Sequence, residues 1–468
     1  MMNQNNLVAN FNFGVSESNR YFRIYNDSIQ QITFDQISPI EKKILNPSIR
    51  NRFLNTYNKL LFIDINSNVI LGSKDTDFTS FYPSSHFDFI NGINQFINNE
   101  FPLPAKLFIN PTNKCNYRCQ VCSFNPTRGI KGTNSMPVYI IEEIIDIFKK
   151  RSPNASINIS GGGEPTLHKD IEYILQLIND SDIKIFMTSN ASRSDKNFWK
   201  TAVRACSMLV FSVRGLTLDN YKAIDNPANK DTDINKVISN IEMIIDLREK
   251  NRRTEDLIIG INSLVHPLNA GHFYNFSKKM VEIGIDFLHF TPVAPNLSKW
   301  NIDIDEKQRD LTDRNFNEIN EIVSKSKIKI RLPKIPYKDL SGDNYYLDVT
   351  SRHGQRNGCY VALFSPALVP SEVDPLKAKL SPCRASEVQD NNLLSYSNDI
   401  VKGSYAGIWN YDNYLRVQSM IKGKCSYCYM ERQYLDLKFM VDIKSKYGSK
   451  GEFVLLFDLM DKTSVQYF

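Results

Sequence analysis

Short apolar runs alternate with amphipathic stretches through the middle of the chain. The apolar runs predict six strands, at residues 107–112, 156–160, 183–188, 208–213, 257–264 and 286–291. Between them, apolar residues recur three and four positions apart, which predicts helices near 137–150, 168–179, 195–205, 233–250, 270–283 and 309–325. Pro137 lies near the start of the first helix and Asp170 in the first turn of the second. Strand–helix units in succession predict an α/β fold with a parallel sheet and right-handed crossovers.

The first 100 residues have a different pattern. Arg20-Tyr-Phe-Arg-Ile-Tyr predicts a strand, and residues 60–71 predict a hairpin that turns at Asn66-Ser-Asn. Residues 85–100 predict a helix that leads into the first strand of the α/β region. The segment therefore indicates a separate α+β extension.

Composition excludes several classes of protein. The chain has 468 residues, of which 42% are hydrophobic and 23% charged, a globular composition with room for several domains of about 100–200 residues. A net charge of +6 without a dense basic block does not favour nucleic-acid binding. No apolar run approaches the roughly 20 residues of a membrane span, and the polar start does not resemble a signal peptide. We therefore expect a cytoplasmic protein without nucleic-acid or membrane partners.

Three cysteines share one short loop directly after the first predicted strand. Cys115, Cys119 and Cys122 have the spacing C-x3-C-x2-C. A disulfide framework would need an oxidising compartment, and a structural zinc would normally have a fourth ligand. A [4Fe–4S] cluster normally takes four cysteines, so three thiolates would leave one iron open to bind a substrate or cofactor.

A glycine-rich segment follows the second predicted strand. The run Ile157-Asn-Ile-Ser-Gly-Gly-Gly-Glu-Pro-Thr-Leu ends that strand at Gly162, Gly163 and Glu164. Glycines permit close approach of the backbone to a ligand, and the Glu164 carboxylate can receive an ammonium group. By itself the segment could be an ordinary turn.

Together, the cysteine loop and the Gly-Gly-Glu-Pro segment resemble the motifs of the radical S-adenosylmethionine (SAM) enzymes. The resemblance implies a partial (β/α)6 TIM-type barrel, with a [4Fe–4S] cluster on Cys115, Cys119 and Cys122 and SAM on its open iron. In barrels of this type the active site lies at the C-terminal ends of the strands. Glu164 would then receive the ammonium group of SAM.

The same resemblance implies further SAM-binding positions. The full set is Gly162, Gly163, Glu164, Ser189, Asn190, Ser212, Arg214, Asn262, Val293 and Val121. Arg214 stands where the family more often has an acid, and its guanidinium could clamp a carboxylate. Val121 stands where the family often has an aromatic residue, and Phe124 lies just past the loop. Asn262 could equally be a buried amide satisfied by backbone.

The C-terminal third contains four more cysteines: Cys359, Cys383, Cys425 and Cys428. They resemble the ligands of a Twitch domain, the shortened form of the SPASM domain, which implies one auxiliary [4Fe–4S] cluster; zinc is the alternative metal. The segments at 358–365 and 380–383 are expected as the arms of a hairpin, with a long insert at 366–379. The remaining Cys206 is expected to be a buried apolar residue.

The resemblance implies three domains: an extension at 1–100, a radical SAM barrel at 101–330 and a Twitch/SPASM-like iron–sulfur domain at 331–468. The implied reaction is reductive cleavage of SAM to a 5′-deoxyadenosyl radical, which abstracts hydrogen from a substrate. An external donor such as flavodoxin or ferredoxin would supply the electron, and the auxiliary cluster would accept one from the substrate radical.

Two classes of substrate remain open. One is a peptide or protein, oxidised or cross-linked by a maturase, which the N-terminal extension favours. The other is a small molecule, such as an aminocyclitol, sugar or nucleoside of a natural-product pathway, acted on by a dehydrogenase or deoxygenase. A non-catalytic iron–sulfur or zinc scaffold is the alternative outside enzymes. No general base can be chosen among His168, His266, His289 and the many Lys and Tyr residues.

Overall fold

The computed structural model describes part of the chain. The described residues are 7–12, 19–24, 29–32, 59–64, 69–72, 101–104, 106–120, 122, 134–151, 155–254, 256–292, 305–325, 329–331, 359, 362, 366–371, 374–383, 396–421 and 451–456. The chain divides into two compact units. One comprises 1–105, 359–364 and 429–468, and the other comprises 106–358 and 365–428. The predicted three-domain boundaries stay a prediction.

The larger unit is built on one ten-stranded sheet, ordered β12-β11-β10-β9-β8-β7-β6-β13-β14-β15. All pairings from β6 to β12 are parallel. These strands are β6 (Lys106–Ile109), β7 (Ser156–Ile159), β8 (Lys184–Ser189), β9 (Met208–Ser212), β10 (Ile258–Val265), β11 (Phe287–Pro292) and β12 (Lys329–Arg331). The six predicted strands and the parallel α/β fold are confirmed, whereas β12 was not predicted.

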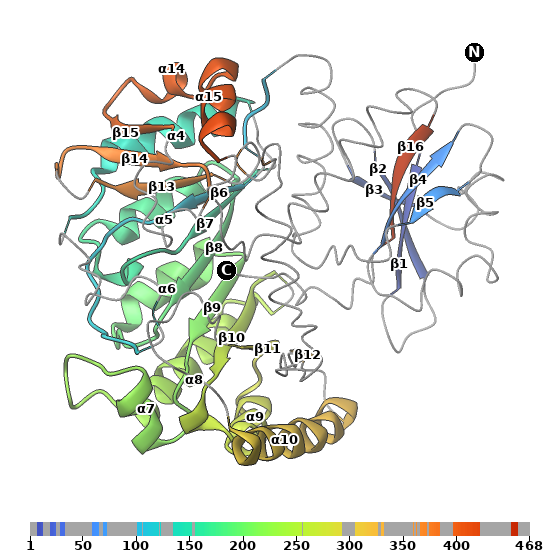
Figure 1. Cartoon of the computed structure of the whole chain (residues 1–468), viewed down its shortest axis with the longest axis vertical. Coiled ribbons are helices and arrows are strands. Elements are labelled where there is room, and N and C mark those ends of the chain that lie inside the picture. Colours follow the sequence, from blue (N-terminus) through green and yellow to red (C-terminus); the bar gives the residue numbers. More distant parts are fainter. Residues whose placement is uncertain are drawn as a thin grey trace. The chain divides into compact units, whose positions relative to one another are not determined.

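Helices connect successive parallel strands and lie along one side of the sheet (Figure 1). They are α4 (Val138–Arg151), α5 (Ile171–Asn179), α6 (Lys196–Ala205), α7 (Leu218–Ile224), α8 (Ile234–Lys250), α9 (Phe273–Ile283) and α10 (Glu306–Lys325). Six of them confirm the predicted helices. The prediction missed α7 because seven residues are too few for a clear helical period, although Thr217 caps it with a capping box.

Strand register explains why the sheet is buried. Leu107 pairs with Ile157, and Ile157 pairs with Ile185, so aliphatic side chains form a continuous row across three strands. All three side chains are fully buried. Residues on one row point to the same face because side chains alternate along a strand. The apolar row covers one face and leaves the alternate positions, such as Asn158, on the other.

A hairpin extends the sheet beyond β6. It consists of β13 (Ala367–Pro370) and β14 (Ala378–Ser381), followed by the antiparallel β15 (Ser397–Ile400). The sequence predicted the second arm, but the prediction that residues 366–379 form an insert is wrong. The first arm lies inside that segment, where it pairs in parallel with β6. Two short helices follow, α14 (Tyr405–Ile408) and α15 (Tyr411–Ile421).

The smaller unit contains two antiparallel three-stranded sheets. One has the order β1-β2-β3, with β1 (Leu7–Asn12), β2 (Asn19–Ile24) and β3 (Ile29–Ile32). The other has the order β16-β4-β5, with β4 (Lys59–Asp64), β5 (Val69–Gly72) and β16 (Gly451–Leu456). The strand predicted at residues 20–25 and the hairpin at 60–71 are confirmed. The helix predicted at 85–100 lies outside the described residues.

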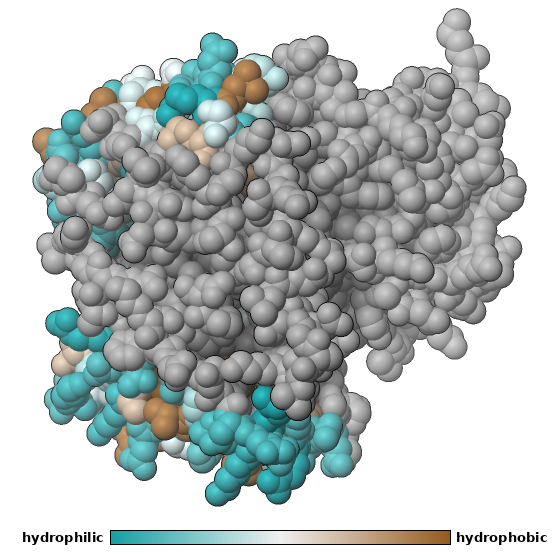
Figure 2. Space-filling model, in the orientation of Figure 1, coloured by the Kyte–Doolittle hydropathy of each residue, from teal (hydrophilic) through white to brown (hydrophobic). Residues whose placement is uncertain are grey.

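The surface over α10 is predominantly hydrophilic (Figure 2). Within the described part of the chain, no helix combines the length and the apolar composition needed to cross a membrane.

Candidate active site

The cysteine loop follows β6 at the C-terminal end of the sheet. Cys115 is exposed, Cys122 is half-buried and Cys119 is buried. Distant backbone fixes the loop: the amides of Arg118 and Gln120 donate to the carbonyls of Asn226 and Ile224, at 3.0 and 2.9 Å. The loop is therefore held by the last residue of α7 and the segment just after it, more than 100 residues away.

A buried tyrosine pair makes a second anchor for the loop. The hydroxyls of Tyr117 and Tyr221 lie 2.5 Å apart, and the two rings meet edge to face with centroids 6.2 Å apart. Burial raises the pKa of both hydroxyls, so both stay neutral and one donates to the other. The pair ties the middle of the cysteine loop to α7.

Gly163 brings the glycine-rich segment against the same loop. A Cβ at Gly163 would lie 2.2 Å from the carbonyl oxygen of Thr112 and 2.4 Å from that of Lys114. The next amide, that of Glu164, donates to the Lys114 carbonyl at 2.8 Å. Glycine is required here because backbone approaches backbone, a close contact between the two motifs themselves.

The carboxylate of Glu164 is buried and held by three donors. Oε1 accepts from the backbone N–H of Thr166 at 3.1 Å and from Oγ of Ser189 at 2.8 Å, and Oε2 accepts from the backbone N–H of Asn190 at 2.8 Å. A carboxylate offers about four acceptor sites, and the Thr166 side chain is a further hydrogen-bond partner of this one. Burial raises the pKa of Glu164 and these hydrogen bonds lower it; a bound cation would lower it further.

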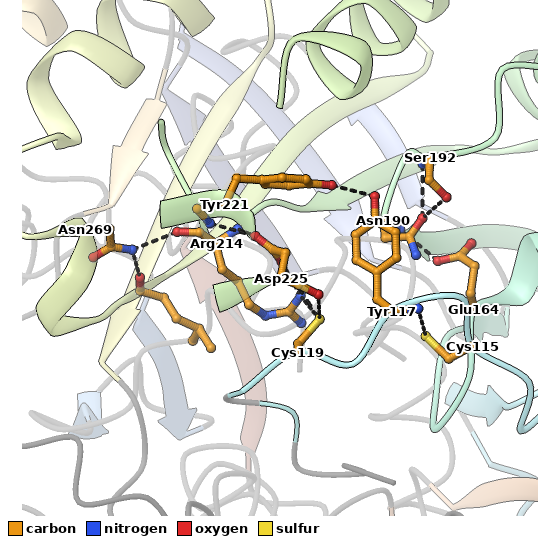
Figure 3. A network of polar contacts seen from close by, with 12 residues as sticks. Cys115, Tyr117, Cys119, Glu164, Asn190, Ser192, Arg214, Tyr221, Asp225 and Asn269 are labelled. Carbon is orange, nitrogen blue, oxygen red and sulfur yellow. Dashed lines mark hydrogen bonds and ion pairs between the residues drawn. The ribbon is translucent and has the colours of Figure 1, made fainter. Parts of the chain in front are cut away.

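Side-chain amides connect β8 to the cysteine loop (Figure 3). Asn190 Nδ2 donates to Oδ1 of Asn116 at 2.8 Å, and Asn116 Nδ2 donates to Oγ of Ser192 at 2.8 Å. Ser192 Oγ in turn donates to Oδ1 of Asn190 at 2.7 Å. The ring of three bonds places Glu164, through Asn190, in a fixed relation to the loop.

Arg214 lies beside Cys119 and is paired with Asp225. Its Nη1 is 3.2 Å from Asp225 Oδ1 and 3.5 Å from Cys119 Sγ. Asp225 Oδ2 accepts from the backbone N–H groups of Arg214 and Gly215, at 3.1 and 2.7 Å. Burial raises the pKa of Asp225, and Arg214 and the amides lower it. Burial is the larger effect, so the pKa of Asp225 lies above its ordinary value; the guanidinium and the two amides all donate to its oxygens and so stabilise the ionised form. Burial alone would lower the pKa of Arg214, but Cys119 and Asp225 raise it.

The thiols influence one another electrostatically. Although part of the Cys115 side chain is exposed, the protein packed around its sulfur desolvates the thiol and, with smaller contributions from Glu164 and Cys122, raises its pKa to about 12. Burial also raises the pKa of the Cys119 thiol. The Arg214 guanidinium lowers this pKa, whereas Asp225, Cys122 and Cys115 raise it. Within the described residues, no three His, Cys, Asp or Glu side chains converge as a metal-binding group. The chemistry of the donor set, three neighbouring thiols beside a guanidinium, still fits an anionic cluster held by three thiolates.

The remaining predicted SAM positions lie at neighbouring strand ends. Ser212 is paired in register with Asn262, and Asn262 with His289. Oδ1 of Asn262 accepts from Oγ1 of Thr291 at 3.2 Å, so the amide has a side-chain partner. Val121 and Val293 lie outside the described residues, and the SAM-binding roles of the set stay predictions.

The auxiliary cysteines are only partly described. Cys359 and Cys383 are half-buried, Cys359 in the smaller unit and Cys383 in the larger. Cys425 and Cys428 lie outside the described residues. Cys206 is fully buried, as the sequence predicted, and burial raises the pKa of its thiol.

Two of the histidines considered as bases have structural partners. His168 is hydrogen-bonded to the carbonyl of Met136 and accepts from the amide of Asp170. His266 Nδ1 accepts from the amide of Leu268 and begins the 3₁₀ turn Pro267–Asn269. Burial lowers the pKa of both rings.

Sequence reasoning missed several residues of the site. They are Asn116, Tyr117, Asn158, Ser160, Ser192, Tyr221 and Asp225. Asn158 and Ser160 are 1% and 2% exposed, and their side-chain polar atoms have no hydrogen-bond partner within the described residues. A polar residue inside an otherwise aliphatic strand, such as Asn158 in β7, was the available signal.

Comparison with known proteins agrees with this arrangement. Residues 109–264 match the family described as the Radical SAM superfamily, and that range contains the cysteine loop, Glu164 and Arg214. Residues 109–264, a third of the chain, are therefore a radical SAM domain.

The fold of the chain is similar to that of SuiB from Streptococcus suis bound to S-adenosylmethionine. The TM-score is 0.51 at 14% identity, covering 99% of both chains. The structure of SuiB bound to precursor peptide SuiA gives a TM-score of 0.50 and also covers 99% of both chains.

Among curated proteins, the GTPase Obg of Brachyspira hyodysenteriae is 28% identical to this chain over 136 residues. The matched segment covers 28% of this chain and 20% of Obg. A segment of 221 residues is 29% identical to a protein named "Probable GTP 3',8-cyclase" from Methanocaldococcus jannaschii, which covers 45% of this chain and 69% of the cyclase. The chain thus spans only a fifth of the length of the first of these relatives.

Proposed function

We propose that this radical SAM chain is a maturase that oxidises or cross-links a peptide or protein side chain. One observation carries the chemistry: the three-cysteine loop is fixed against the segment that bears the buried Glu164 carboxylate. Cys115, Cys119 and Cys122 would hold a [4Fe–4S] cluster. Bound there, the cluster would deliver an electron to SAM, whose cleavage yields the 5′-deoxyadenosyl radical that removes a substrate hydrogen.

The residues around the loop would bind and orient SAM. Glu164, held by Ser189 and the Asn190 amide, would accept the SAM ammonium on Oε2. Ser212 and Asn262 lie side by side at the next strand ends and would contact other polar groups of SAM. Burial of Glu164 excludes water from its carboxylate, which strengthens its interaction with a cation.

The likeness in fold to SuiB, which binds a precursor peptide, supports a peptide substrate. Asn158 and Ser160 also favour an amide-rich ligand, because buried polar atoms normally have partners. The similarity to a named GTP cyclase supports a second candidate, a radical SAM enzyme acting on a nucleoside-type small molecule.

We further propose an auxiliary cluster on Cys359, Cys383, Cys425 and Cys428, which would accept an electron from the substrate radical. An external donor such as flavodoxin or ferredoxin would reduce the first cluster, in the cytoplasm.

The first experiment counts iron and measures SAM cleavage in the full chain after anaerobic reconstitution. We expect about eight irons in the wild type, from two four-iron clusters, and 5′-deoxyadenosine after reduction with SAM. Changing Cys115, Cys119 and Cys122 together to Ala should leave about four irons and abolish 5′-deoxyadenosine. Cys206→Ala is the matched control and should retain iron and cleavage. SAM cleavage by the triple variant would refute the assignment.

Mass spectrometry distinguishes the two substrate classes. Peptides encoded beside the gene and nucleoside triphosphates are each incubated with reduced enzyme and SAM. A peptide that loses hydrogen in step with 5′-deoxyadenosine formation supports the maturase, and a modified nucleotide supports the second candidate.

A further inference from the structure

We propose that Arg214 and Asp225 form a buried charge pair that sets the reduction potential of the cluster held by Cys119. The proposal rests on the proposed cluster-binding role of the cysteine loop and assigns Arg214 a positioning and electrostatic role at that loop.

The contacts of Cys119 place both charges at its sulfur. Arg214 Nη1 lies 3.5 Å from Sγ, and Sγ lies 3.2 Å from the carbonyl oxygen and 3.9 Å from Oδ1 of Asp225. The Asp225 side chain is fully buried, and that of Arg214 is 20% exposed. Both charges therefore act where solvent screens them weakly.

The role of the sulfur changes when it binds iron. As a thiol, Cys119 can donate its S–H to the Asp225 carbonyl. As a thiolate ligand it has lost this proton and can only accept, and an N–H of Arg214 is a donor within reach. Hydrogen bonds to the sulfurs and nearby charge are two of the factors that set cluster potentials.

Asp225 holds the guanidinium in this position. The carboxylate is itself anchored by the amides of Arg214 and Gly215, at 3.1 and 2.7 Å. The Arg214 carbonyl accepts from Nδ2 of Asn269 at 2.7 Å, so the backbone of the pair is also fixed (Figure 3). Neither charge can turn away from the loop without breaking several of these bonds.

The two charges have opposite effects on reduction. Reduction adds one electron, and so one negative charge, to the cluster without moving a proton. The Arg214 cation stabilises this added charge, and the Asp225 carboxylate destabilises it. Removing one charge at a time should therefore shift the potential in opposite directions, which a purely structural role would not produce.

The test is a redox titration of the anaerobically reconstituted full chain without SAM, followed by electron paramagnetic resonance. The signal of the first cluster is the one missing from the triple variant of Cys115, Cys119 and Cys122. Arg214→Met should lower the equilibrium constant for reduction about tenfold, which is about 59 mV for one electron. Asp225→Asn should raise it at least threefold, and Arg214→Lys should lie between Arg214→Met and the wild type.

Arg248 and Asp286 provide the matched control, because a buried arginine and a half-buried aspartate form an ion pair at the opposite, N-terminal ends of the strands. Arg248 also donates to the carbonyl of Leu257, just before β10. Arg248→Met and Asp286→Asn should leave the equilibrium constant within twofold of the wild type.

Two results would overturn the proposal. In the first, Arg214→Met and Asp225→Asn both load full iron and both keep an equilibrium constant for reduction within twofold of the wild type. In the second, the two substitutions shift this constant in the same direction. If Arg214→Met does not load iron, Arg214→Lys and Asp225→Asn decide by the same criterion. Loss of the cluster in all three variants, with the controls loaded, would assign the pair a structural role. Absence of this signal from the wild type would instead refute the proposed function.

Discussion

Gly163→Ala is the substitution whose consequence the structure defines most sharply. The added Cβ would lie 2.2 Å from the Thr112 carbonyl oxygen and 2.4 Å from that of Lys114. Ordinary contact distances are about 3.5 Å, so backbone must move by about 1 Å. The neighbours are main-chain atoms on the cysteine loop, which cannot rotate away as a flexible side chain could.

Two effects follow from that displacement. Overpacking a well-packed site costs about 1–3 kcal/mol of stability. A misplacement of about 1 Å can lower a reaction rate about 100-fold, and here it separates the cysteines from Glu164. We therefore expect Gly163→Ala to remain folded, with a free energy of unfolding lower by about 1–3 kcal/mol, and to cleave SAM about 100-fold more slowly.

The assay measures 5′-deoxyadenosine formation at saturating SAM, together with urea denaturation and iron content. Gly407→Ala is the matched control, because a Cβ at Gly407 meets no atom within 4 Å and the residue lies in α14. In a helix, Ala is favoured over Gly by up to about 1 kcal/mol, so this control should be neutral or slightly stabilised. Wild-type cleavage by Gly163→Ala would show that the contact between the two motifs does not position the site.

Three further predictions concern the neighbouring groups. Ser189→Ala removes a donor 2.8 Å from the Glu164 carboxylate. It should weaken SAM binding, measured by calorimetry, and lower the free energy of unfolding by about 1–3 kcal/mol. Unchanged SAM affinity and unchanged stability would contradict this prediction. Tyr117→Phe and Tyr221→Phe should each lower the free energy of unfolding, measured by urea denaturation, by about 1 kcal/mol. The double variant should lose less free energy than the sum of the two single losses. Full additivity would show that the two hydroxyls act independently. Burial lowers the pKa of His266 from 6.5 to about 4, so between these pH values the unfolded chain binds a proton that the folded chain does not. Stability should therefore fall as the pH drops from about 6.5 to 4; the gap corresponds to about 3 kcal/mol, which partial solvent access reduces to about 1–2 kcal/mol, and the fall should be smaller in His266→Asn.

The sequence alone determined the features that depend on local patterning. Alternation of apolar runs and amphipathic stretches gave the six strands and six helices of the α/β region, because burial of each element imposes its period on its own residues. The spacing of Cys115, Cys119 and Cys122, together with the Gly162–Glu164 segment, indicated the radical SAM superfamily. These motifs are readable because each lies within a dozen residues.

Only the tertiary structure decided which distant residues meet. Cys119 lies beside Asp225, the ion-pair partner of Arg214, although the cysteine and the aspartate are 106 residues apart, and no local period records this contact. The same holds for β13, which adds to the sheet beside β6, and for β16, which pairs with β4. Strand hydrogen bonds are made by backbone, which is the same for every residue, so the sequence specifies which segments can be strands but not which distant strands pair.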